Sequence, residues 1–289
     1  MPEVALAQGT IHYRDTGEGE PVLFLHGYLM DGRLWDPVVD RLTPRFRCIR
    51  PDLPLGAHRT PLNPDTDLSL PGIAHLVANL LAGLDLREVT LVGNDMGAGL
   101  AQIVAANHPE RIGRLVLTDG ECFDNCPPAW FRPLVPASRV PGLLTLAFQS
   151  LRLRAARRLP CAYGWLTKRA LPDDLIDEWV EAFFGDPGVR HDCVKVTRDF
   201  VPAALLDAAR RLTSFDKPAL IAFAPEDRLF PFEHAERLTA MLPDARLEAV
   251  PDSLTWVMRD QPELISALIG EFIRSTPTDR AAPADADPA

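Results

Sequence analysis

The sequence predicts an α/β fold in which a mostly parallel central sheet is flanked by helices and carries an inserted helical lid. Short apolar segments alternate with helical patterns over residues 1–120, and this alternation resumes after residue 212. Alternation of this kind is typical of a parallel sheet that is covered by helices on both faces. Between residues 121 and 212, helical patterns dominate and no convincing strand is found, which indicates an insertion.

The predicted elements follow from the spacing of the apolar residues. The strands are expected at Thr10–Tyr13, Val22–His26, Phe46–Ile49, Val89–Val92, Leu115–Thr118, Ala219–Ala224 and Arg246–Val250. Core helices are expected at Leu34–Leu42, Leu70–Leu84, Gly97–Asn107, Phe232–Met241 and Pro262–Ile273. In the insertion, helices are expected at Leu143–Arg158, Asp173–Phe184 and Val194–Arg211. These elements predict a core of residues 1–120 and 213–274, a lid of residues 121–212, and a disordered tail of residues 275–289.

The composition excludes several classes of function. A net charge of −10 argues against nucleic-acid binding, because contacts to phosphates need clustered Lys and Arg. No segment approaches the roughly 18 consecutive apolar residues that a membrane helix needs, and we find no signal peptide. Five cysteines without a secretory signal indicate reduced thiols, so a cytoplasmic location is expected. We expect no metal, because Cys122 and Cys126 lack a second Cys or His pair nearby to complete a zinc site, and we expect no cofactor.

The segment Gly93-Asn94-Asp95-Met96-Gly97 follows a predicted strand and begins a predicted helix. This context fits a nucleophile elbow with the pattern Gly-x-nucleophile-x-Gly, whose glycines allow a tight, strained turn. The N-terminus of the helix favours negative charge at this point. A carboxylate in the central position attacks saturated carbon and leaves an alkyl ester on the enzyme. We therefore interpret Asp95 as a nucleophile, with a simple helix cap as the alternative.

A second motif, Phe24-Leu25-His26-Gly27-Tyr28, ends another predicted strand. In folds with a nucleophile elbow, one donor of the oxyanion hole is the N–H group of the residue after His-Gly, and the other follows the nucleophile. These donors are predicted to be the backbone N–H groups of Tyr28 and Met96. His26 is interpreted as a structural residue that braces its loop.

The order of these motifs, followed by Ala224-Pro225-Glu226-Asp227 and Pro251-Asp252-Ser253, resembles the α/β-hydrolase superfamily over about residues 11–273. The aspartate on the elbow is similar to the haloalkane dehalogenase and epoxide hydrolase branch. The resemblance implies that Asp227 is the triad acid that orients a histidine. Asp119, just after a predicted strand, is the alternative acid. A small, fairly apolar substrate under the lid is also implied.

The histidine of the triad is missing. In the family it follows the last core strand in a stretch like Asp-Ser-Gly-His-Phe, whereas this sequence reads Asp252-Ser253-Leu254-Thr255-Trp256. Thr255 therefore stands at the histidine position, and its hydroxyl does not ionise near neutral pH. Loss of a positioned base lowers a rate by about 10²–10⁴. His234, near Asp227 in the sequence, and His191 in the lid are the candidate replacements, although His234 is more simply interpreted as a surface residue.

Other residues expected in this branch are also absent. Its epoxide hydrolases use two lid tyrosines, and the lid here contains only Tyr163, which disfavours an epoxide. Its dehalogenases often place a Trp after the nucleophile to hold the halide, and here Met96 takes that position.

Three functions remain open. We predict a dehalogenase-like hydrolase with Asp95 as the nucleophile. The alternatives are a lyase or isomerase that uses Asp95 as an acid or base, and a ligand-binding protein without catalysis.

Overall fold

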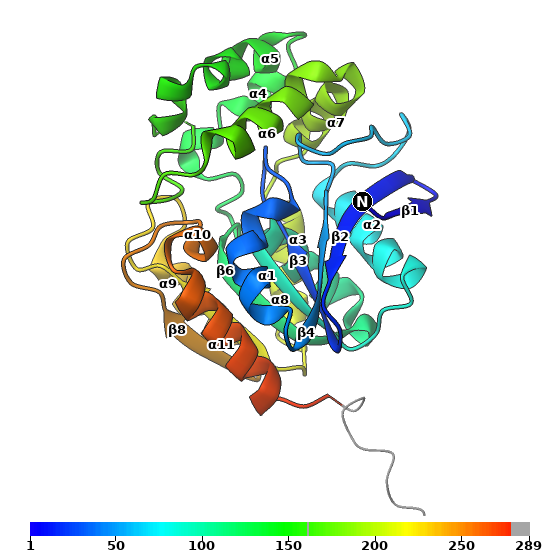
Figure 1. Cartoon of the computed structure of the whole chain (residues 1–289), viewed down its shortest axis with the longest axis vertical. Coiled ribbons are helices and arrows are strands. Elements are labelled where there is room, and N and C mark those ends of the chain that lie inside the picture. The colour runs from blue at the N-terminus through cyan, green and yellow to red at the C-terminus, as the bar shows by residue number, and fades with distance from the viewer. Residues whose placement is uncertain (161, 279–289) are drawn as a thin grey trace, which may run out of the picture.

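The computed structural model describes residues 1–160 and 162–278, and its centre is one eight-stranded sheet (Figure 1). The strand order is β1-β2-β4-β3-β5-β6-β7-β8. The pairs β1–β2 and β2–β4 are antiparallel, and all the other pairs are parallel. The strands are β1 (Glu3–Leu6), β2 (Gly9–Thr16), β3 (Glu20–Leu25), β4 (Phe46–Pro51), β5 (Val89–Asp95), β6 (Ile112–Gly120), β7 (Ala219–Phe223) and β8 (Ala245–Ala249). The predicted mostly parallel α/β architecture is confirmed.

Helices cover both faces of this sheet. They are α1 (Asp36–Leu42), α2 (Leu70–Gly83), α3 (Met96–Asn107), α8 (Ala203–Leu212), α9 (Phe232–Met241), α10 (Val257–Asp260) and α11 (Pro262–Ser275). Two short 3₁₀ helices, η1 (Gly32–Trp35) and η2 (Pro109–Arg111), accompany them. On one face α1 packs against α11, and on the other α3 packs against both α2 and α8 (Figure 1). Every residue of the central strands β5 and β6 is buried, as expected for parallel strands covered on both faces.

The described part of the chain between β6 and α8 contains only helices. They are α4 (Leu134–Ser138), α5 (Leu143–Phe148), α6 (Asp173–Gly185) and α7 (Pro187–Arg198), with the 3₁₀ helices η3 (Ala129–Phe131), η4 (Gln149–Arg152) and η5 (Arg154–Arg158). We call α4 to α7 the lid, because Figure 1 shows them together above the sheet. The division into core and lid at residues 120 and 212 stays a prediction.

Two predicted lid helices were wrong in their extent. The segment Leu143–Arg158 is one short α-helix followed by two 3₁₀ helices, because Leu153 has extended backbone angles that interrupt the helix. The segment Val194–Arg211 is divided between α7 and α8, and Pro202 precedes the second helix. Proline has no N–H group to continue the hydrogen-bonding of a helix, which explains the break.

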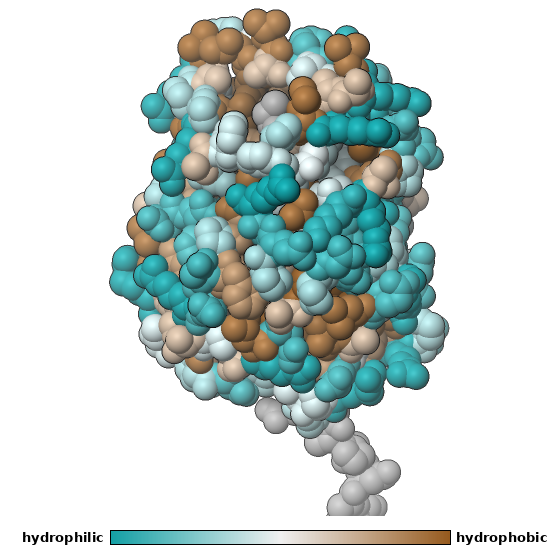
Figure 2. Space-filling model, turned by 90° about the vertical axis from the view of Figure 1, so that its left-hand side faces the viewer, coloured by the Kyte–Doolittle hydropathy of each residue, from teal (hydrophilic) through white to brown (hydrophobic). Residues whose placement is uncertain are grey.

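Apart from Met1, the exposed large hydrophobic residues lie between β6 and α8. Figure 2 shows brown side chains at the top of the molecule, over the lid. These exposed residues are Trp130, Val140, Leu143, Leu146, Leu153, Leu159 and Val201. Within the described residues, no helix is both long enough and apolar enough to span a membrane. Of the predicted disordered tail, residues 279–289 lie outside the described residues.

Candidate active site

Asp95 occupies a strained turn between β5 and α3. Its backbone angles are φ 54° and ψ −131°, a conformation that residues other than glycine rarely adopt. A Cβ atom at Gly97 would lie 2.3 Å from the carbonyl oxygen of Leu25, and one at Gly27 would lie 2.3 Å from Oδ1 of Asp95. The turn can therefore form only because the residues that surround Asp95 lack side chains at these two points.

The carboxylate of Asp95 is held through one of its two oxygens. Oδ1 accepts hydrogen bonds from the backbone N–H groups of Met96, at 2.7 Å, and of Tyr28, at 3.2 Å. These are the two donors that the motifs indicated, and the structure brings them together on a single atom. Among the described residues, Oδ2 has no hydrogen-bond partner. The N-terminus of α3 adds a partial positive charge beside the carboxylate.

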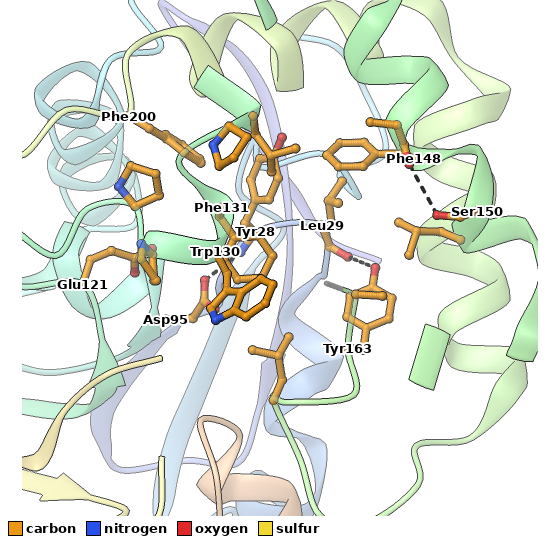
Figure 3. Close-up of a pocket in the computed structure, with 18 of the residues that line it drawn as sticks. Tyr28, Leu29, Asp95, Glu121, Trp130, Phe131, Phe148, Ser150, Tyr163 and Phe200 are labelled. Carbon is orange, nitrogen blue, oxygen red and sulfur yellow. Dashed lines mark hydrogen bonds between the residues drawn. The ribbon is translucent and has the colours of Figure 1, made fainter. Parts of the chain in front are cut away.

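A cavity of about 230 Å³ lies between the elbow and the lid, with Asp95 in its wall. Its lining is mainly aromatic and apolar, and includes Trp130, Phe131, Phe148, Phe200 and Phe230 (Figure 3). Over the described residues, this lining contains no Lys, Arg or His. The cavity therefore suits a small, largely apolar molecule, and its carboxylates face no fixed cation.

Two further aspartates lie behind the elbow, and each is held through one oxygen. Oδ1 of Asp227 accepts from the backbone N–H groups of Leu229, at 2.6 Å, and Phe230, at 2.8 Å. Oδ1 of Asp119 accepts from the backbone N–H group of Ala224, at 2.9 Å. Oδ2 of each aspartate is buried and has no partner within the described part of the chain. Asp227 thus both orders its loop and keeps one carboxylate oxygen free.

Thr255 lies beside this free oxygen. The hydroxyl of Thr255 lowers the pKa of Asp227, although burial raises that pKa more. The two side chains nevertheless do not reach hydrogen-bond geometry, because Oγ1 of Thr255 and Oδ2 of Asp227 are both buried without a partner among the described residues. The side-chain amide of Asn94 donates to the carbonyl oxygen of Thr255 at 2.7 Å, which fixes this loop to the elbow. A neutral hydroxyl therefore stands where the resemblance places an imidazole.

None of the histidines considered as a base lines the cavity. Nε2 of His26 accepts from the backbone N–H group of Leu53 at 2.8 Å, and Nδ1 is 2.8 Å from the carbonyl oxygen of Gly27. His26 therefore braces its loop, as interpreted from the sequence. His234 packs edge-on against Phe123, and His191 is exposed beside Asp192.

One cavity residue, Glu121, was missed by the sequence interpretation. Its backbone N–H group is 3.4 Å from the carbonyl oxygen of Asp95, because the neighbouring Gly120 pairs with Asp95 across strands β5 and β6. Only 4% of the surface of Glu121 is exposed, and its side chain lines the cavity. The available signal was an acidic residue directly after a buried strand, but we assigned that position to the start of the lid.

Asp95, Glu121, Asp119 and Asp227 form a group of buried carboxyls that we call the carboxyl cluster. Burial raises the pKa of Asp95 to about 6; the Met96 and Tyr28 N–H groups oppose this rise, and the charge of Asp227 adds to it. Burial also raises the pKa of Asp227 to about 6. The pKa of Glu121 is raised well above its usual value by burial and by the charge of Asp95, and that of Asp119 by burial and by Asp227. Burial therefore disfavours the charged form of each carboxyl in this cluster.

The cluster does not form a metal site. Throughout the described residues, no three His, Cys, Asp or Glu side chains are grouped so that they could hold a metal ion. Cys122 and Cys126 are buried core residues.

The fold is matched by known proteins. The family described as alpha/beta hydrolase fold matches residues 20–262 of this chain. The chain belongs to the α/β-hydrolase family. Its eight-stranded sheet and the elbow after β5 are those of an α/β-hydrolase, and the resemblance inferred from the motifs is confirmed at the level of the superfamily.

Similar proteins of this family are named hydrolases. This α/β-hydrolase is 25% identical over 281 residues to the 2-hydroxy-6-oxo-6-phenylhexa-2,4-dienoate hydrolase of Burkholderia cepacia, covering 94% of this chain and 93% of the relative. It is 29% identical over 205 residues to a haloalkane dehalogenase of Mesorhizobium japonicum, covering 68% of this chain and 63% of the relative.

Solved structures share the fold. The crystal structure of the haloalkane dehalogenase DatA from Agrobacterium tumefaciens superimposes with a TM-score of 0.78 at 23% identity, covering 96% of each chain. A thermophilic esterase from Thermogutta terrifontis superimposes with a TM-score of 0.72 at 21% identity, covering 96% of this chain and 99% of the esterase. At these identities the likeness concerns the fold alone.

Proposed function

We propose that this α/β-hydrolase opens a bond at saturated carbon in a small apolar molecule, with Asp95 as the nucleophile. The observation that carries the proposal is the unequal environment of the two carboxylate oxygens. Oδ1 is held by two N–H groups, whereas Oδ2 has no partner among the described residues and belongs to a side chain in the cavity wall. A nucleophile needs this arrangement, because one oxygen is fixed and the other is free to attack.

The same contacts argue against an ordinary esterase. In an esterase, the two N–H groups of the oxyanion hole hold the oxygen of the substrate carbonyl. Here both N–H groups, from Tyr28 and Met96, already bind Oδ1 of Asp95. An attack on saturated carbon needs no such donors for the substrate. Once the alkyl ester forms, Oδ1 becomes its carbonyl oxygen and already lies in the hole, ready for hydrolysis.

A second candidate function is acid–base catalysis without a covalent intermediate. The pKa of Asp95, at about 6, lies close to neutral pH, where a carboxyl exchanges protons efficiently. A lyase or isomerase that used Asp95 as an acid or base would lose its turnover in the Asp95→Asn variant. It would never form a covalent adduct on Asp95.

The test is covalent labelling of Asp95. We expect incubation with phenethyl bromide, stopped by an acid quench, to trap one phenethyl group on the protein, detectable by intact mass and located on Asp95 by peptide mapping. Asp95→Asn is close in size but a poor nucleophile, so the adduct should be absent. Asp216→Asn is the matched control, because Asp216 is an exposed carboxylate far along the sequence, and it should label like the wild type. Labelling that persists in Asp95→Asn would contradict the proposal.

A further inference from the structure

Glu121 and Asp95 lie at the same end of the cavity (Figure 3). The pairing of β5 with β6 holds their backbones together, with the N–H group of Glu121 at 3.4 Å from the carbonyl oxygen of Asp95. Helix α3 packs closely on the other side, since a Cβ atom at Gly99 would lie 3.2 Å from Cβ of Glu121. Oε2 of Glu121 is buried without a partner within the described residues. The carboxyl is thus held close to the nucleophile and has no structural hydrogen bond to maintain.

The tyrosine hydroxyls of the cavity are already engaged elsewhere. Tyr163 donates to the carbonyl oxygen of Leu29 at 3.1 Å. The hydroxyl of Tyr28 is 2.6 Å from Oγ1 of Thr197, which itself donates to the carbonyl oxygen of Cys193. The proton of Tyr28 is therefore directed to Thr197, away from Asp95. Of the described residues that line the cavity, Glu121 is left as the acidic group besides Asp95, and burial together with the charge of Asp95 raises its pKa well above the usual value.

We propose that Glu121 is the acid–base residue of this site and takes the place of the absent histidine, and that the substrate carries a C–O bond, as in an epoxide. This inference rests on the proposed function, because it requires Asp95 to be the nucleophile. In this proposal Glu121 supplies the proton, so no lid tyrosine is needed. The small number of lid tyrosines was the reason why the sequence disfavoured an epoxide.

In the first half of the reaction, Oδ2 of Asp95 attacks the epoxide carbon and the C–O bond breaks. The electron pair of that bond goes to the departing oxygen, which takes the proton of Glu121. An alkyl ester on Asp95 and a carboxylate at Glu121 result. Asp95 and Glu121 together carry one negative charge, which is on Asp95 before this step and on Glu121 after it. No charge is therefore added to the apolar cavity.

In the second half, the carboxylate of Glu121 removes a proton from water as the water oxygen attacks Cγ of the ester. The charge that develops on Oδ1 is stabilised by the N–H groups of Tyr28 and Met96. Collapse of the tetrahedral intermediate breaks the ester bond. The departing alkoxide takes one of the two water protons, which are now held by Asp95 and Glu121, and the other water proton stays on Glu121. Asp95 returns as a carboxylate that carries one oxygen from water. A retaining glycosidase likewise pairs a carboxylate nucleophile with a carboxyl that serves first as acid and then as base, although its water attacks the sugar carbon and not the carboxylate carbon.

The chemistry of the leaving group separates the two roles of Glu121. An alkoxide leaves only when it is protonated, whereas bromide leaves without a proton. Glu121 is therefore needed in both halves of the reaction with styrene oxide, but only in the second half with phenethyl bromide. The two probes carry the same aromatic ring, so their binding in the cavity is closely matched.

The experiment compares the wild type with Glu121→Gln, which has nearly the same shape and no acidic proton. We expect turnover of styrene oxide to fall by about 10²–10⁴, the usual contribution of a positioned acid or base. The initial rate of Asp95 labelling by phenethyl bromide should stay within a few-fold of the wild type. The ester should then accumulate in Glu121→Gln because no base hydrolyses it, whereas in the wild type it should be hydrolysed. In H₂¹⁸O, one turnover of the wild type should place ¹⁸O in Asp95. Glu121→Asp, which keeps an ionisable group, should recover part of the activity.

The outcomes distinguish the two proposals. Wild-type turnover of styrene oxide by a folded Glu121→Gln, checked by thermal unfolding, would overturn the role of Glu121 and leave Asp95 as the nucleophile. A wild-type ester that forms and never hydrolyses would overturn that role as well. If neither probe labels Asp95 in either protein, the proposed function itself fails.

Discussion

At pH 8, Asp227→Asn is expected to be more stable than the wild type by up to about 3 kcal/mol. Burial raises the pKa of Asp227 from 3.8 to about 6, and about 1.4 kcal/mol corresponds to each pH unit of such a rise. Asparagine keeps the oxygen that accepts from Leu229 and Phe230. It also replaces the buried Oδ2, which has no partner in the described structure, with a neutral amide that can donate to its neighbours.

The pH dependence has a definite sign. The folded pKa of Asp227 is raised, so its favourable contribution to folding is fully present below about pH 4 and is lost as the pH rises through about 6. The pKa of Asp95 is also raised to about 6, so Asp95 changes the free energy of unfolding with pH in the same direction. The free energy of unfolding of the wild type should therefore fall between pH 4 and pH 8, and the advantage of Asp227→Asn should disappear near pH 4.

Urea unfolding at pH 4, 6 and 8 measures this difference. Asp216→Asn serves as the control, because its exposed carboxylate should change the free energy of unfolding by a few tenths of a kcal/mol at most. An Asp227→Asn variant that is less stable than the wild type at pH 8 would show that the charge of Asp227 is stabilised in the folded protein.

Thr255→His is expected to accelerate hydrolysis of the Asp95 ester by about 10²–10⁴ when it is introduced into Glu121→Gln. Thr255 stands beside the free oxygen of Asp227, so an imidazole there can donate to Asp227 and activate water for the ester. Thr255 is fully buried, and the larger ring should cost about 1–3 kcal/mol of stability through overpacking. The decay of the phenethyl adduct, followed by intact mass, measures the rate.

Thr255→Val is the matched control for this substitution. Valine has nearly the shape of threonine and cannot act as a base, so the adduct in Glu121→Gln should persist. A folded Thr255→His variant whose adduct decays no faster than in this control would contradict the placement of residue 255 at the histidine position.

Much of the fold could be predicted because each central strand is apolar and most core helices have one apolar face, while α3 is buried nearly all round. Strand β1 escaped prediction since it is a short, half-exposed edge strand that is defined by its pairing with β2. Strands β5 and β6 extend to Asp95 and Gly120, beyond their apolar cores. The polar or small residues at strand ends are of the same types as those in loops. The sequence therefore does not show where a strand ends, because pairing with the neighbouring strand determines it.

The sequence predicted those residues of the candidate site that belong to short motifs at the ends of strands. Asp95 and Met96 are adjacent, and Tyr28 joins them through a short motif at the end of a strand. Glu121 escaped prediction because it reaches Asp95 only through the register between β5 and β6. Such a register is set by the packing of the whole sheet and leaves no mark in the sequence around Glu121.

The carboxyl cluster has a consequence for how this chain has been selected. Oδ2 of Asp119 and Oδ2 of Asp227 lie buried without partners among the described residues, and each such atom costs about 1–3 kcal/mol. Replacement by asparagine would keep the accepting oxygen and remove the buried charge, so it would be favoured in a protein that only needed to fold. The proposed function accounts for this cost at the cavity, because two of the four buried carboxyls, Asp95 and Glu121, take part in its reaction.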